Sequence, residues 1–104
     1  MIVELRTYTL YAGKLPEFLK IYEELGKPIQ LRILGNLIGA FTTDIGPLNQ
    51  YVHLWGYESL ADREARRAEL AKDPDWPTYL AKASSLFQNM ETKIMVPVPF
   101  SPLK

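Results

Sequence analysis

The sequence predicts an α+β fold of the ferredoxin-like kind, with the element order β-α-β-β-α-β. Four short segments are rich in β-forming residues, and two longer stretches carry apolar residues at helical spacing. The length of 104 residues allows one ordinary domain, residues 1–104. Two right-handed crossovers place both helices on one face of a four-stranded antiparallel sheet. We therefore expect the other face of the sheet to be uncovered.

The first half of the chain contains two predicted strands and a helix. Residues Ile2 to Leu10 form the first strand, which ends before Gly13. The helix that follows has apolar positions at Leu15, Phe18, Leu19, Tyr22 and Leu25 and ends at Gly26. A shorter helical piece covers Pro28 to Leu34. Asn36 to Thr42 is the second strand.

The second half repeats the pattern with clearer boundaries. Turn-forming residues 44–48 precede a third strand, Asn49 to Tyr57. Ser59 and Asp62 predict the start of a helix over Leu60 to Lys72. Asp73 and Pro74 restart the helix, whose apolar stripe is Trp76, Tyr79, Leu80, Ala83 and Phe87. Thr92 to Val96 is the fourth strand, and the prolines that follow predict an extended arm.

Composition excludes several functional classes. Twelve basic and twelve acidic residues give a formal charge of zero, which argues against nucleic acid as the main partner. The chain has no cysteine and one histidine, so thiol chemistry and a multi-histidine metal centre within one chain are excluded. No apolar run is long enough to span a membrane, and no secretory signal is visible. We expect a cytoplasmic protein with no cofactor.

Alternation in the strands assigns side chains to the two faces of the sheet. The small set of the third strand, Val52, Leu54 and Gly56, is predicted to pack under the helices. The bare face would then carry Glu4, Arg6, Tyr8, Tyr51, His53, Trp55 and Tyr57. Four large aromatic side chains at ~150–250 Å² each exceed the apolar patch of a typical monomer, ~300–600 Å². We therefore predict a homodimer through this open face.

Two sheets packed in this way enclose either a pocket lined with rings or a filled dimer core. In a pocket, Arg6 would orient an anionic group of a small-molecule ligand, and His53 would move a proton. Tyr8, Tyr51, Trp55 and Tyr57 would stack on an aromatic or apolar ligand. The structural alternatives are a pair between Arg6 and Glu4, a His53 satisfied by a neighbour, and rings that form interface core.

The basic stretch of the third helical segment has a simpler interpretation. Arg63, Arg66 and Arg67 interleave with Asp62 and Glu64 at distances that allow i,i+3 or i,i+4 pairs. We interpret this stretch as a solvated helix face.

Several of these residues also resemble a known family. Glu4-Leu5-Arg6-Thr7-Tyr8 resembles the opening strand of NIPSNAP domains, and Gly46-Pro47-Leu48-Asn49 followed by His53-Leu54-Trp55 and Tyr57 resembles their central signature. Supporting matches are Arg63, Arg67, Trp76, Tyr79 and the closing Phe100-Ser101-Pro102-Leu103. The resemblance implies a dimeric α+β barrel in a superfamily that also holds cofactor-free antibiotic-biosynthesis monooxygenases and haem-degrading enzymes. It also implies that Arg63 and Arg67 anchor their helix to the end of the sheet.

The family resemblance implies less about activity. If the chain is an enzyme, the superfamily favours a cofactor-independent, monooxygenase-like reaction. Animal members are mitochondrial, whereas this chain begins its first strand at Ile2, so we expect a bacterial cytoplasmic member. The alternative to a small-molecule binder or enzyme is a non-enzymatic structural or protein-interaction module.

Overall fold

The computed structural model describes all residues from Met1 to Lys104 and contains one four-stranded antiparallel sheet. The strands are β1 (Ile2–Leu10), β2 (Asn36–Thr42), β3 (Gln50–Tyr57) and β4 (Phe87–Met95), in the order β2-β3-β1-β4. β1 and β3 are therefore the two central strands, and β2 and β4 are the edge strands. β1 faces β3 in a register that places Arg6 opposite His53 and Tyr8 opposite Tyr51.

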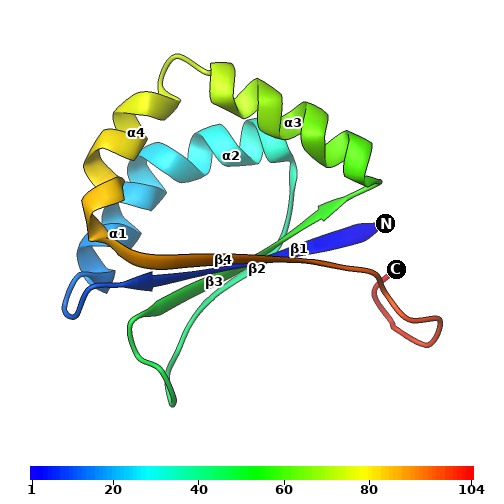
Figure 1. Cartoon of the computed structure of the whole chain (residues 1–104), viewed down its shortest axis with the longest axis horizontal. Coiled ribbons are helices and arrows are strands. Elements are labelled where there is room, and N and C mark those ends of the chain that lie inside the picture. The colour runs from blue at the N-terminus through cyan, green and yellow to red at the C-terminus, as the bar shows by residue number, and fades with distance from the viewer.

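The helices all lie on one side of the sheet, as predicted (Figure 1). They are α1 (Leu15–Ile21), α2 (Lys27–Leu34), α3 (Leu60–Lys72) and α4 (Trp76–Ala83), with a π-helical turn η1 (Tyr22–Gly26) and a short 3₁₀ turn η2 (Ser84–Leu86). The α+β, ferredoxin-like fold class is confirmed. No helix is both long and apolar enough to cross a membrane.

The first helix does not end at Gly26. Helical structure continues from Leu15 to Leu34, with η1 joining α1 to α2, and Gly26 keeps right-handed helical angles. The glycine is needed for packing, because an added Cβ would lie 2.7 Å from Cε1 of Tyr79 and 2.8 Å from Cδ1 of Tyr22. The helix ends instead at Gly35, whose φ of 88° suits a residue without a Cβ.

Two boundaries in the second half also differ from prediction. The cap of α3 is confirmed, since the Asp62 backbone N–H donates to Ser59 Oγ at 3.1 Å. However, α4 starts at Trp76, and Asp73 caps the end of α3. Phe87 opens β4, where it pairs with Leu10, so β4 begins five residues earlier than expected.

The assignment of faces to the sheet is reversed. All the residues predicted to lie on the bare face lie under the helices, and His53, Trp55 and Glu4 are fully buried. The aromatic residues of this face join two core clusters, in which they pack against Phe18 and Tyr22 of the first helix and Leu70 of α3. Val52 and Leu54 lie on the other, uncovered face and are only partly buried.

The reversal has a physical cause in the helices. Their inner sides carry polar groups, which bond to the polar groups of the sheet: Arg63 of α3, for example, donates to Glu4 of β1. Large rings also fill the space between a sheet and a helix layer better than the small set Val52, Leu54 and Gly56. The helices of the same chain therefore cover the aromatic face, and a homodimer is not needed to bury it.

The uncovered face instead carries Leu5, Val52, Leu54 and the exposed Phe41, with Glu91 and Lys93 on β4. The chain after β4 forms the predicted extended arm (Figure 1), which turns back so that Leu103 lies near Val3 and Leu54. Phe100 of this arm is 89% exposed.

Candidate functional site

A cavity of about 190 Å³ lies between the sheet and the helix layer, where β1 and β4 meet α2, α3 and α4. Its side chains that can form hydrogen bonds are Arg6, Tyr8, Gln30, Arg67, Trp76 and Tyr79. Its remaining walls are apolar and consist of Leu80, Phe87 and Met90. Rings and a few convergent polar groups in a concave space are typical of a small-molecule site.

Arg6 is held rigidly at the wall of this cavity. Its Nη1 donates to Glu4 Oε2 at 3.0 Å, and its Nε donates to the Tyr8 hydroxyl at 3.0 Å. The pair with Glu4, which the two-residue spacing allowed, is thereby confirmed. Because two partners fix the guanidinium plane, its remaining N–H groups have a defined direction.

Glu4 is the anion at the centre of this network. Its Oε2 also accepts hydrogen bonds from Arg63 at 2.8 Å and from Thr92 at 2.6 Å. Burial alone would raise the pKa of Glu4, but the bonds from Arg63 and Thr92 and the charge of Arg6 outweigh it and lower the pKa to about 2. Glu4 is therefore ionised at neutral pH.

Arg67 has no such partner. It lines the cavity from α3, yet it makes no ion pair, and its Nη1 is shielded from solvent without a hydrogen-bond acceptor. Burial and the nearby charge of Arg6 both lower the pKa of Arg67. Three guanidinium groups, those of Arg6, Arg63 and Arg67, thus lie near the single carboxylate of Glu4, and only Arg6 and Arg63 are paired with it. Buried charges are normally paired, so this cluster lacks an anion.

The predicted site residues divide into two groups. Arg6 and Tyr8 line the cavity together. Tyr51, His53 and Trp55 lie in the core beside it and do not line it, and the ring centroids of Tyr51 and His53 are 4.9 Å apart. Tyr57 is buried under α3, where burial and the charge of Glu4 raise its pKa to about 12.

His53 is a neutral core residue. Its Nδ1 accepts a hydrogen bond from the Trp55 indole N–H at 3.0 Å, so the proton of the neutral ring sits on Nε2, which has no partner. Burial, reinforced by the charge of Arg6, lowers its pKa to about 3. A general base must reach the proton that it takes, and His53 does not line the cavity.

Sequence reasoning missed Arg67, Gln30 and the cavity roles of Trp76 and Tyr79. A signal for Arg67 was available, because Arg63, Arg67 and Leu70 recur at i, i+4 and i+7 and so share one helix face. Leu70 is buried, and that face turns inward. Of the three arginines predicted to lie on a solvated face, only Arg66 does so: its side chain is 41% exposed, and its Nε donates to Asp62 at 2.9 Å.

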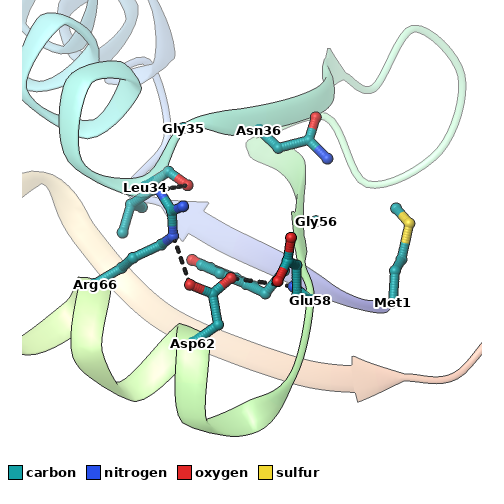
Figure 2. Close-up of a pocket in the computed structure, with 9 residues that line it drawn as sticks. Met1, Leu34, Gly35, Asn36, Gly56, Glu58, Asp62 and Arg66 are labelled. Atoms are coloured by element: carbon teal, nitrogen blue, oxygen red, sulfur yellow. Dashed lines mark hydrogen bonds and ion pairs between the residues drawn. The ribbon is translucent and has the colours of Figure 1, made fainter.

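A larger cavity of about 300 Å³ lies at the far end of the sheet, between the start of α3 and the end of α2. Figure 2 shows Arg66 reaching from α3 towards Asp62 and Leu34. Arg66 Nη1 donates to the backbone carbonyls of Ile33 and Leu34 and so satisfies the end of α2. Arg66, the only basic side chain that lines this cavity, is already paired with Asp62, so this cavity is a weaker candidate for an anionic ligand. No three acidic or histidine side chains in the structure are placed to hold a metal ion.

Comparison with known proteins identifies the chain's relatives. The NIPSNAP family model matches residues 3–102. The chain belongs to the NIPSNAP family. It is 36% identical over 99 residues to a NipSnap homologue of Dictyostelium discoideum, covering 91% of this chain and 42% of that protein. It is 35% identical to human NipSnap homologue 2, covering 99% of this chain and 35% of that protein. This NIPSNAP domain therefore spans less than half the length of these two relatives.

Solved structures agree with this assignment. A NIPSNAP family protein of Agrobacterium tumefaciens is 50% identical, with a TM-score of 0.96 over 99% of this chain and 98% of that one. A NIPSNAP-like domain protein of Burkholderia xenovorans is also 50% identical, with a TM-score of 0.92 over 97% and 88%. An antibiotic biosynthesis monooxygenase is 14% identical, with a TM-score of 0.67 over 95% of this chain and all of that one, and shares the fold.

Proposed function

We propose that this NIPSNAP domain binds a small anionic organic molecule in the cavity between its sheet and its helices. The observation that carries the proposal is Arg67, a cavity-lining arginine without an ion-pair partner. The anionic group of the ligand supplies the missing counter-charge, with Arg6 fixed beside it. The rings of the cavity hold the apolar part of the molecule.

Arg67 suits binding better than it suits stability. A guanidinium without a counter-ion, next to another guanidinium, is a cost to the folded state. Replacing it by a side chain of similar length without charge, as in Arg67→Met, is therefore expected to leave the free energy of unfolding unchanged or to increase it. Residues kept for function at the expense of stability behave in this way.

Arg66→Met is the matched control. It removes an arginine one position away that bonds to Asp62 and to two carbonyl groups, so it should lower stability and leave binding intact. The experiment measures melting temperature for wild type and both variants, with benzoate, acetate or inorganic phosphate added at constant ionic strength. The proposal expects at least one anion to stabilise wild type and Arg66→Met but not Arg67→Met. Equal shifts in all three proteins, or none, contradict it.

We also propose a homodimer through the uncovered face of the sheet. Leu5, Val52 and Leu54 form an apolar centre there, and Glu91 and Lys93 lie two residues apart on the edge strand β4. In a two-fold symmetric contact, if Glu91 of one copy faces Lys93 of the partner copy, then Lys93 of the first copy faces Glu91 of the partner. The exposed arm around Phe100 lies at the end of the same sheet.

A further inference from the structure

We infer that the ligand of this cavity is a small aromatic monocarboxylate, and that Gln30 recognises its carboxylate together with Arg67. The inference rests on the proposed function and adds the chemical class of the ligand and a specificity-determining residue. It starts from Gln30, which lies on α2, lines the cavity and is 2% exposed.

The amide of Gln30 has a fixed orientation. The Tyr22 hydroxyl donates to Gln30 Oε1 at 2.5 Å, and both side chains are buried. The amide oxygen is thus satisfied inside the protein, while Nε2 makes no hydrogen bond to another residue. Two N–H donors are left for a molecule in the cavity, since a buried amide normally satisfies both ends.

The π-helical turn η1 makes this arrangement possible. In an ordinary α-helix with ~3.6 residues per turn, residues eight apart are rotated by about 80° from each other. A π-helical turn inserts one extra residue into the helix, which brings Tyr22 and Gln30 onto one face. π-helical turns occur frequently at functional sites, and here the turn orients a cavity residue.

The polar groups of the cavity act mainly as donors. Arg67, the free N–H groups of Arg6 and the Nε2 hydrogens of Gln30 can only donate. The oxygen of Tyr8 already accepts from Arg6, so its hydroxyl hydrogen is free to donate as well. Such a set suits a carboxylate, whose oxygens only accept, and is unfavourable for an amine or a metal cation.

The walls and the volume define the rest of the ligand. The rings of Trp76 and Tyr79 lie 4.8 Å apart at 32°, with Phe87 and Tyr8 across the cavity. A volume of about 190 Å³ equals roughly six waters at ~30 Å³ each, which fits an organic molecule of about ten non-hydrogen atoms. One aromatic ring with a carboxylate fits this space, whereas inorganic phosphate would leave the rings unfilled.

The test is calorimetric titration of the full chain with benzoate, benzamide and inorganic phosphate. Benzamide keeps the ring and removes the charge. Hydrogen bonds to a charged group are stronger than those to a neutral one, so benzoate is expected to bind at least about tenfold more tightly than benzamide. Phosphate is expected to bind no more tightly than benzamide. Gln30→Glu keeps an acceptor for Tyr22 and places a negative charge in the cavity, so it should weaken benzoate binding by about tenfold or more.

Gln50→Glu is the matched control, because Gln50 lies on the uncovered face of the sheet and its new charge is remote from the cavity. It should bind benzoate as wild type does. If phosphate binds and benzoate does not, the aromatic class is wrong, while the proposed binding of an anion in this cavity stands. Equal benzoate binding by wild type and Gln30→Glu contradicts the role of Gln30. Binding of neither anion overturns the proposed function as well.

Discussion

Glu4 and His53 are both fully buried under the helices, but Glu4 is ionised at neutral pH and His53 is neutral. Three donors converge on Glu4 and keep it ionised, whereas burial beside Arg6 keeps His53 neutral. The two groups therefore link stability to pH over different ranges. Glu4 contributes stability that is present above about pH 4.5 and is lost only as the pH falls from there towards 2.

His53 is expected to dominate the pH dependence of stability between pH 7 and 5. Its pKa is near 6.5 in the unfolded chain and about 3 in the folded one, so the unfolded state takes up the proton first. Stability is therefore fully present above pH 6.5 and falls below it, by about 2 kcal/mol at pH 5. Urea denaturation at several pH values measures this loss.

The control for this prediction is His53→Gln, whose amide oxygen can still accept from the Trp55 indole. Since glutamine does not titrate, its curve should be nearly flat over the same interval. A loss of equal size in the variant would assign the pH dependence to other groups.

At the same scale, the sequence predicts pairs within an element better than it predicts sites built from several elements. The Glu4–Arg6 pair follows from two residues on one face of one strand, and it is present. Arg67 and Gln30 line one cavity only because α3 and α2 pack over the same part of the sheet. No spacing along the chain encodes this arrangement, although the i, i+4, i+7 pattern from Arg63 to Leu70 indicates that Arg67 turns inward.

At the scale of elements, η1 shows a local signal that tertiary packing overrides. Glycine is unfavourable inside a helix, which is why Gly26 predicted an end. The structure keeps the helix and uses the missing side chain, because the rings of Tyr22 and Tyr79 occupy the space of a Cβ. The start of β4 was missed for a related reason, since Phe87 fits an apolar helical stripe but is held in the sheet by Leu10.

Gly26→Ala is expected to destabilise the protein by about 1–3 kcal/mol, the usual cost of overpacking. The sign of the change in the free energy of unfolding distinguishes overpacking from helix propensity, because glycine-to-alanine changes inside a helix otherwise stabilise by about 1 kcal/mol. Ala68→Gly, on the exposed side of α3, measures this propensity effect alone. The free energy of unfolding in urea gives both values. A gain in stability for Gly26→Ala would show that the two tyrosine rings do not restrict this position.

At the scale of the whole molecule, the sequence predicted the fold but assigned the two faces of the sheet the wrong way round. Alternation shows which residues share a face, and every residue of the aromatic set does lie on one face. It does not show which of the two faces meets the helices. That choice depends on the helices, whose inward Arg63, Arg67 and Gln30 complement the polar groups of β1.

Because the aromatic face is covered by the helices, the predicted dimer contact now involves the residues of the opposite face of the sheet. We expect light scattering at micromolar concentration to give twice the chain mass of 11.9 kDa. Val52→Lys places a charge in the apolar centre of the uncovered face and should reduce the mass to that of one chain. Leu31→Lys is the control, because Leu31 is also partly exposed but lies on α2, away from this face, so it should remain dimeric.

A charge exchange on β4 tests the same contact without disturbing the apolar centre. If Glu91 of one copy faces Lys93 of the other, Glu91→Lys alone brings like charges together and should weaken the dimer. Adding Lys93→Glu restores opposite charges and should restore the mass, which a merely destabilised single variant would not show. Circular dichroism confirms that each variant is folded. A wild-type protein that remains at 11.9 kDa across the micromolar range would contradict the dimer.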